Sequence, residues 1–410
     1  MVSAFWRRIM IFLAILGPGI ITATVDNDAG GITTYSIAGA HFGYALLWTL
    51  IPITIALIII QEMAARMGAV TGQGLADLIR ENFGVKITFY MMIGLIIANI
   101  ATTIAEFAGI AAAAGIFGVS RWLVVPACAA LVWVLITRAN YRTVEKVFLF
   151  IAFFYIAYII SGVMAKPDWG VVGNALITPH LEFSTPFLLL FIAVIGTTIT
   201  PWMQFYLQSS IVEKGITVKE YKYSRWDVII GCLITDIVAF FIIVATAATL
   251  FQSGIRITDA ADAAIALKPF AGQFAGILFG IGLFAAALFG ASILPLATSY
   301  YICEGMGWES GINRRFKDAP QFYTLFTAII VIGAAVVLLP RIPLVKLILA
   351  SQVINGIILP IILIAMIKLI NDKRIMGSHT NPWWYNIIVW IFTLIIIAAT
   401  TALIVVTFIL

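Results

Sequence analysis

Long apolar stretches alternate with short polar segments along almost the whole chain. Each stretch is long enough to cross about 30 Å of hydrocarbon as an α-helix. The alternation predicts an all-α polytopic membrane protein with eleven transmembrane helices. Their approximate limits are 9–34, 43–65, 87–117, 121–137, 146–164, 185–210, 228–251, 270–302, 321–339, 344–369 and 385–409.

Composition supports this pattern and excludes several classes of protein. Hydrophobic residues make up 62% of the 410 residues and charged residues only 10%. The longest loop, about 165–184, is too short to form a core of its own, so residues 1–410 are expected to be a single membrane domain. The sequence contains no HExxH, GxSxG or P-loop motif, so we expect neither an enzyme nor an ATP-driven pump, and no cofactor.

Lysine and arginine predict the orientation of the spans. If the N-terminus is inside, six of the 24 basic residues lie in outer loops and the other eighteen in inner ones. The positive-inside rule then predicts a multi-pass protein of the plasma (inner) membrane with a cytoplasmic N-terminus and an extracellular or periplasmic C-terminus. The excess of basic residues is spread over alternate loops, which fits a lipid bilayer as partner and not a nucleic acid. No obligate protein partner is expected. The six outer residues are Arg121, Lys166, Arg256, Lys268, Arg341 and Lys346.

The first span carries the segment Asp26-Asn27-Asp28-Ala29-Gly30-Gly31 in its middle. A charge at the bilayer centre costs at least about 2.5–3.5 kcal/mol, so acids at this depth usually mark the path of an ion. The adjacent glycines, with Gly17-Pro18-Gly19 upstream, favour a helix that is broken where the acids lie. An unwound helix at mid-membrane frees carbonyl groups and helix ends to bind a cation.

The sixth span has its own helix breaker, Pro201, preceded by Thr197, Thr198 and Thr200. Proline in a helix interior removes a hydrogen bond and clashes with the preceding turn. Breaks at corresponding positions of two halves indicate a transport site between inverted repeats. We therefore expect a five-plus-five arrangement, with repeats at 9–165 and 185–370 and an extra helix at 385–410. Alternatively, the threonine hydroxyls only satisfy carbonyl groups freed by the proline kink.

Other polar residues within the spans leave their roles open. Glu106 in the third span could relay protons or pair with an arginine, and Gln352 in the tenth could reach the ion or bond another helix. We assign no role to Asp236. Glu62 and Arg66, one turn apart near a helix end, are expected to be a solvated pair of little energetic consequence.

Several motifs, spread from the first span to the tenth, resemble the NRAMP family of divalent-metal transporters. They are Gln61-x-x-Ala64-Ala65-Arg66-x-Gly68-x-Val70-Thr71-Gly72, Cys303-Glu304-x-x-Gly307-Trp308, and Ser351-Gln352-Val353-Ile354. The resemblance implies a LeuT-like fold that works by alternating access, with helices 1 and 6 broken at mid-membrane and the ion held between them.

The resemblance also implies a set of metal ligands, from which this sequence departs. Asp28 falls on the family's metal-binding aspartate, while Ala29 replaces its proline and Gly31 its ligating asparagine. Thr197 falls where the family has alanine, and Thr200 falls where it has the metal-binding methionine.

Further positions complete the predicted site. Gln352 matches a glutamine that approaches the metal, and Asp26 is a further candidate ligand. Trp202 replaces a histidine, and an alternative alignment would bring Met203 to the site instead of Thr200. In the third span Thr103 replaces an aspartate of the family's proton path, whereas Glu106 is retained. The pattern is similar to the NRAMP-related magnesium transporters, a divergent branch of the family.

The substitutions predict the substrate. A thioether favours softer transition metals, whereas carboxylate, hydroxyl, carbonyl and water suit hard ions. Mg²⁺ keeps several waters and binds through one or two carboxylates, so we expect transport of Mg²⁺, and also of Mn²⁺. Loss of the histidine and of the third-span aspartate predicts uptake without proton coupling, driven by membrane potential. The alternatives are a proton-coupled Mn²⁺/Fe²⁺ symporter of the ordinary NRAMP type and a Na⁺-coupled amino-acid symporter.

Overall fold

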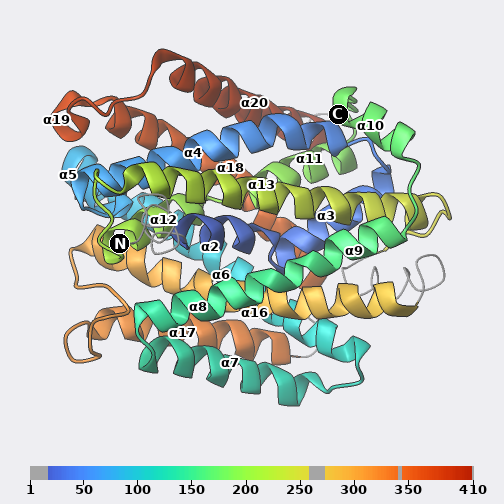
Figure 1. Cartoon of the computed structure of the whole chain (residues 1–410), viewed down its shortest axis with the longest axis horizontal. Coiled ribbons are helices and arrows are strands. Elements are labelled where there is room, and N and C mark those ends of the chain that lie inside the picture. Colours follow the sequence, from blue (N-terminus) through green and yellow to red (C-terminus); the bar gives the residue numbers. More distant parts are fainter. Residues whose placement is uncertain (1–16, 258–272, 340–343, 409–410) are drawn as a thin grey trace, which may run out of the picture.

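The computed structural model describes residues 17–257, 273–339 and 344–408, whose regular elements are all helices (Figure 1). Ten helical segments of these residues are long and apolar enough to cross a membrane. Together with the broken first helix they account for the eleven predicted spans. The starts of the first and eighth predicted spans, 9–16 and 270–272, lie outside the described residues, as does residue 409.

The long helices lie side by side, most of them running along the length of the molecule (Figure 1). The fifth span consists of two α-helices joined by the 3₁₀ turn η3 (Phe153–Tyr155), and the seventh ends in the π-helical turn η4 (Ala247–Phe251). The helices are α4 (Leu50–Thr71), preceded by η2 (Leu47–Thr49), α6 (Val85–Ile116), α7 (Arg121–Arg138), α8 (Tyr141–Ala152), α9 (Ile156–Met164), α13 (Tyr221–Thr246), α16 (Gln273–Met306), α17 (Pro320–Leu338), α18 (Leu344–Asn371) and α20 (Trp383–Phe408).

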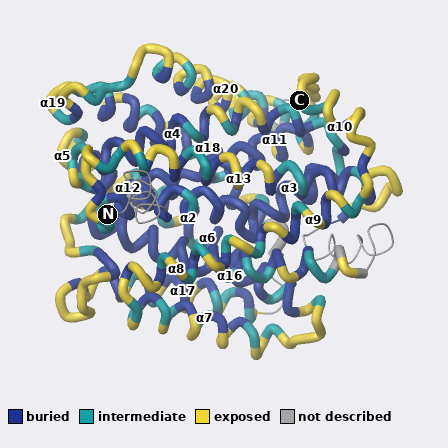
Figure 2. Tube along the Cα trace, in the orientation of Figure 1, coloured by how far each residue is buried: buried dark blue, intermediate teal, exposed yellow. Residues whose placement is uncertain are grey.

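The first and sixth spans are both broken, as predicted. The first consists of α2 (Pro18–Thr24), the 3₁₀ turn η1 (Val25–Asn27) and α3 (Ala29–Phe42). The sixth consists of α11 (Thr185–Thr198) and α12 (Pro201–Glu213). Around them α2 packs against α13, α11 against α18, and α6 against α16. Figure 2 shows that α2, α3 and α12 are almost entirely buried, so both breaks lie inside the helix bundle.

Three short helices occupy segments that were expected to be loops: α5 (Leu75–Phe83), α10 (Trp169–Ile177) and α19 (Lys373–Met376). They are too short to span a membrane, so the search for apolar stretches missed them. The second span also continues to Thr71, beyond its predicted end near 65. It ends where Gly72 adopts a left-handed conformation (φ 65°) and donates to the Gly68 carbonyl at 2.9 Å.

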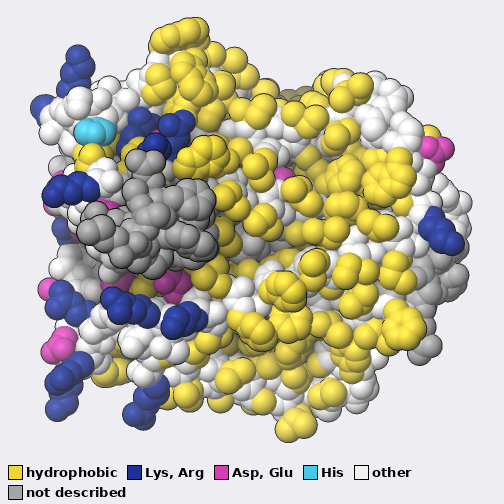
Figure 3. All heavy atoms as spheres, viewed as in Figure 1, with side chains coloured by type: hydrophobic (Ala, Val, Ile, Leu, Met, Phe, Trp, Pro, Cys, Tyr) yellow, Lys and Arg dark blue, Asp and Glu magenta, His cyan; other side chains and the backbone are white. Residues whose placement is uncertain are grey.

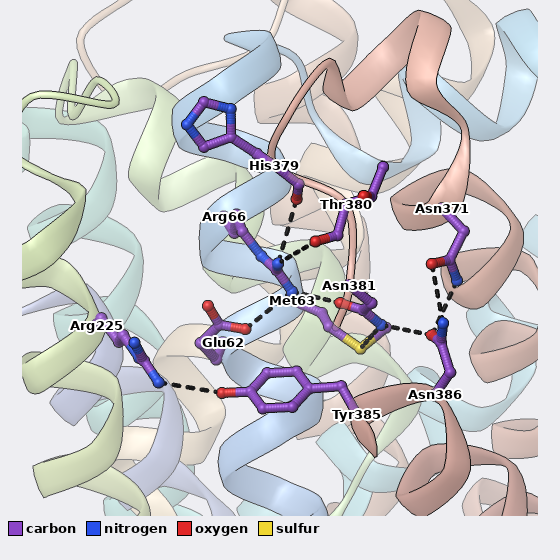
Figure 4. Close-up of polar contacts among 10 residues, drawn as sticks. All are labelled: Glu62, Met63, Arg66, Arg225, Asn371, His379, Thr380, Asn381, Tyr385 and Asn386. Atoms are coloured by element: carbon purple, nitrogen blue, oxygen red, sulfur yellow. Dashed lines mark hydrogen bonds and ion pairs between the residues drawn. The ribbon is translucent and has the colours of Figure 1, made fainter. Parts of the chain in front are cut away.

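The expectation that Glu62 and Arg66 form a solvated pair is wrong. Glu62 is 3% exposed and Arg66 is 7% exposed, and they form an ion pair at 3.1 Å. Figure 4 shows Arg66 also donating to the carbonyl groups of His379 and Thr380, each at 3.2 Å, and to the side chain of Asn381. Arg66 therefore fastens α4 to the linker between α19 and α20. The sequence could not predict this, because the three partners of the linker lie more than 300 positions away.

The surface carries an apolar belt flanked by polar ends. Figure 3 shows hydrophobic side chains over most of the visible face, with Lys and Arg gathered at one end of the molecule. That end holds α5 and α19 (Figure 1). Exposed apolar residues such as Leu123, Ile177 and Phe183 would be unfavourable in water and are suited to lipid. This distribution is that of a membrane-spanning protein.

Candidate metal-binding site

The break in the first span is centred on Asp28. Its backbone is extended (φ −69°, ψ −176°), and its carboxylate caps α3 by accepting a hydrogen bond from the Gly31 N–H at 2.7 Å. An acidic side chain commonly caps a helix in this way, because the first N–H groups of a helix have no partner within it. The cap keeps the carboxylate at the point where the backbone is unwound.

The two glycines after Asp28 let other helices approach the break. A Cβ atom on Gly31 would overlap the carbonyl oxygen of Asp26 and lie 3.2 Å from the Thr197 hydroxyl of α11. A Cβ atom on Gly30 would overlap the amide of Gln352 on α18 and lie 3.1 Å from Oδ1 of Asp28. These close approaches place a carboxylate, a backbone carbonyl, a hydroxyl and an amide around the same turn.

The break in the sixth span lies at Ile199 and Thr200, directly before Pro201. Thr200 is extended (φ −76°, ψ 142°), and α12 starts at the proline, whose fixed φ suits the first turn of a helix. Within the described residues, the hydroxyls of Thr197 and Thr200 have no hydrogen-bond partner, although both residues are at most 2% exposed. Buried polar groups normally have partners, so an unpaired pair beside a helix break is a candidate for ion ligation.

Thr198 behaves differently from its two neighbours. Its hydroxyl donates to the Val194 carbonyl at 2.7 Å and lies 2.6 Å from the Tyr35 hydroxyl, which is then the donor. The alternative interpretation, in which threonines only satisfy backbone carbonyls, therefore fits Thr198 but neither Thr197 nor Thr200.

Glu106 of α6 also contacts the first break. Its Oε2 accepts a hydrogen bond from the Ala29 N–H at 3.1 Å, while Oε1 has no partner among the described residues. The side chain of Ala29 packs against Gly109 on the same helix. None of the ion pairs among the described residues includes Glu106, so the structure offers it no arginine partner.

Three other predicted residues form no hydrogen bond with Asp28 among the described residues. Trp202 and Met203 lie in the first turn of α12 and are buried, and the indole N–H of Trp202 has no partner in the described part of the chain. Thr103 precedes Glu106 by one turn on α6, and its methyl group faces Gly333 of α17. The Gln204 amide, with its NH₂ group turned toward them, donates to the carbonyls of Thr200 (2.8 Å) and Pro201 (2.7 Å).

The structure adds residues that the sequence did not suggest. Asp227 of α13 holds the start of α2, because its carboxylate accepts hydrogen bonds from the N–H groups of Gly17 (3.0 Å) and Gly19 (2.6 Å). Asn27 donates to the carbonyl of Thr235 at 2.9 Å and to its hydroxyl at 3.1 Å. The sequence shows only that Asp227 is an acid near the start of the seventh span. The hydrogen-bond partners of Asp227 are backbone N–H groups, which no sequence motif reveals.

The donor set of the site is mainly oxygen. In the described ranges no three His, Cys, Asp or Glu side chains come together in a way that could hold a metal ion. His41 is occupied near the end of α3, where its Nε2 lies 3.0 Å from the Ile257 carbonyl. Any ion at the first break would therefore be held by carboxylate, carbonyl, hydroxyl and water oxygens, which suits hard cations.

Comparison with known proteins identifies the family. Residues 19–406 match the model of the Nramp family, described as natural resistance-associated macrophage protein-like. The chain belongs to the Nramp family. It is similar to the divalent metal cation transporter MntH of Bacillus subtilis, with 29% identity over 97% of this chain and 93% of MntH. Family membership makes it an Nramp-type divalent-metal transporter of the membrane.

Solved structures agree on the fold. A manganese transporter of Eremococcus coleocola superposes with a TM-score of 0.79 at 22% identity, covering 99% of this Nramp chain and 88% of that protein. Mhp1, a nucleobase-cation-symport-1 family transporter, superposes with a TM-score of 0.57 at 14% identity, covering 95% and 93%. At such identities the likeness concerns the fold alone, which is the predicted LeuT-like arrangement of broken helices.

Proposed function

We propose that this Nramp protein carries Mg²⁺, and also Mn²⁺, across the membrane by alternating access. The observation that carries the proposal is the donor set at the two breaks: the Asp28 carboxylate, the Asp26 carbonyl and the Thr197 hydroxyl meet around one turn, with the Gln352 amide group beside them. Asp28 is the proposed anionic ligand. Oxygen donors with one carboxylate match an ion that keeps part of its water shell.

Thr200 and Gly31 are the positions that would set selectivity in this proposal. Thr200 has a buried, unpaired hydroxyl where the family is expected to have a soft thioether. Gly31 has no side chain, which lets the Asp26 carbonyl and the Thr197 hydroxyl approach the break closely. Both features supply oxygen donors, which favour a hard ion over a softer transition metal.

We propose further that uptake is not coupled to protons. Support comes from Thr103 and Trp202, two residues without a titratable group at positions of the expected proton path. Membrane potential is a sufficient driving force: a divalent ion crossing about 100 mV gains about 4.6 kcal/mol, twice the ~2.3 per charge. At about 1.4 kcal/mol per tenfold, this supports a gradient of more than about a thousandfold.

The orientation and the repeat boundaries are part of the same proposal. The N-terminus would be cytoplasmic and the C-terminus extracellular or periplasmic, supported by the gathering of Lys and Arg at one end (Figure 3). The repeats would be 9–165 and 185–370, each with its first helix broken, and 385–410 would be an added helix.

The test is uptake into proteoliposomes, with an internal Mg²⁺ dye and a pH dye recorded in parallel. The expected result is Mg²⁺ entry that follows an imposed potential and causes no acidification, with liposomes containing the Asp28→Ala variant as the control. Acidification in proportion to the ion that enters would contradict the uncoupled mechanism.

A second candidate function, proton-coupled Mn²⁺/Fe²⁺ symport, is favoured by one observation: Glu106 bonds the turn that carries Asp28. Mn²⁺ entry with acidification, and no Mg²⁺ entry, would support this second candidate.

A further inference from the structure

Two buried carboxylates beside the first break are not used by the proposed Asp28 site. Asp26 of η1 is 1% exposed and Asp236 of α13 is 6% exposed. Among the described residues, no hydrogen bond reaches the Asp26 carboxylate, and Asp236 has only the Thr54 hydroxyl beside it. A buried unpaired carboxylate is costly, and two of them close together require an explanation.

Neighbouring residues bring these two acids together. Asn27, next to Asp26, donates to both the carbonyl and the hydroxyl of Thr235, which is next to Asp236. The Thr235 hydroxyl in turn donates to the carbonyl of Ala23 in α2. These bonds fix η1 against α13 at the level of the two acids. The negative charges of Asp236 and Asp28 both act on the Asp26 carboxylate.

Among the described residues no positive side chain forms an ion pair with these charges. The five ion pairs among the described residues involve neither Asp26 nor Asp236. The effective cost of burying an ion is several kcal/mol even after relaxation of its surroundings.

Neutral oxygen atoms suitable for a cation lie on residues next to the pair, in the chain or in space. The Asn27 carbonyl oxygen Oδ1 is buried and has no partner in the described part of the chain. Thr54 of α4 lies next to Asp236 and uses its own proton to bond the Leu50 carbonyl at 2.6 Å. A hydroxyl whose proton is already used offers only lone pairs, which attract a cation.

We propose that Asp26 and Asp236 form a second divalent-cation site beside Asp28, with Asn27 Oδ1 and the Thr54 hydroxyl as neutral ligands. Two carboxylates balance the charge of one divalent ion, and oxygen ligands with retained water suit Mg²⁺ or Mn²⁺. The inference rests on the proposed function in one respect, namely that the ion offered to this site is the one carried through the Asp28 site. Adjacent sites let one bound ion promote the release of the next, because each ion repels the other.

The experiment is equilibrium dialysis of the purified full chain in detergent against Mn²⁺, with the free ion measured by electron paramagnetic resonance. Wild type is expected to bind a second Mn²⁺ ion per chain. Asp236→Asn should lose that second ion and keep the first, and Asp28→Asn should show the reverse. The matched control is Asp318→Asn, which removes an exposed acid in the loop before α17.

Each other outcome decides against the proposal. A wild type that binds a single ion, removed by Asp28→Asn and kept by Asp236→Asn, overturns the second site and leaves the proposed function standing. A wild type that binds no Mn²⁺ contradicts both. If Asp236→Asn does not elute as a folded protein in size-exclusion chromatography, Asp26→Asn tests the same pair, and retention of both ions in that variant overturns the site.

Discussion

The N–H group of Ala29 donates a hydrogen bond to the carboxylate of Glu106, with 3.1 Å between the nitrogen and Oε2. The bond joins α6 to the turn that carries Asp28. The one acid retained at the expected proton path therefore also has a structural task, since it satisfies a backbone group exposed by the break. Retention of an acid here consequently does not by itself indicate proton transport.

Substitutions at Glu106 separate these two tasks. Glu106→Gln keeps an acceptor for the Ala29 N–H and removes the titratable group, so we expect its uptake to have the same dependence on external pH as wild type. Glu106→Ala leaves the N–H unpaired and should lower stability by about 1–3 kcal/mol, seen as a lower Tm. A change in the pH profile of Glu106→Gln would support the proton-coupled alternative.

Selectivity should respond to Thr200. Thr200→Met introduces a soft sulfur ligand and is expected to shift competition in the uptake assay from Mg²⁺ toward Mn²⁺ and Cd²⁺. Thr200→Val is the matched control, because it removes the hydroxyl without adding sulfur. If all three proteins show the same competition between these ions, residue 200 does not coordinate them.

Transport should depend on Asp28. Asp28→Ala removes the carboxylate at the break. Loss of a residue that only hydrogen-bonds a metal ligand typically costs roughly tenfold to hundredfold, so uptake of every divalent ion should fall by more than that. The measurement is the initial rate in proteoliposomes, with protein content and elution profile matched to wild type. Uptake that survives would place the main site elsewhere, with Asp26 the first residue to examine.

Stability should depend on the Arg66 network of Figure 4. Arg66→Met leaves Glu62 buried without its cation, a change that typically costs about 3–5 kcal/mol. The double variant Glu62→Met with Arg66→Met removes both charges and should regain much of the lost Tm. Arg374→Met is the control. The Arg374 side chain, which forms an ion pair with Asp372, is 86% exposed, so the Tm should not change. A Tm of Arg66→Met equal to that of wild type would contradict the structural role.

Properties that depend on local sequence could be predicted without the fold. Hydrophobic length determines which segments can cross a bilayer, and helix breakers such as Pro201 and Gly30-Gly31 act within one or two turns. The eleven spans and the two breaks were therefore predictable. The resemblance to a family added the ligand positions, because its motifs extend from the first span to the tenth.

Tertiary structure alone decided which polar groups meet. Thr197 and Thr198 are adjacent and chemically identical, yet one hydroxyl is unpaired near Gly31 and the other bonds Val194 and Tyr35. Likewise, Asp236 received no role from the sequence, although its charge acts on Asp26, an acid 210 positions away. Successive residues on a helix point in directions about 100° apart, and the packing of neighbouring helices determines which direction faces the site. Hydrophobic pattern therefore determined the spans and their breaks, and helix packing determined the candidate ligands.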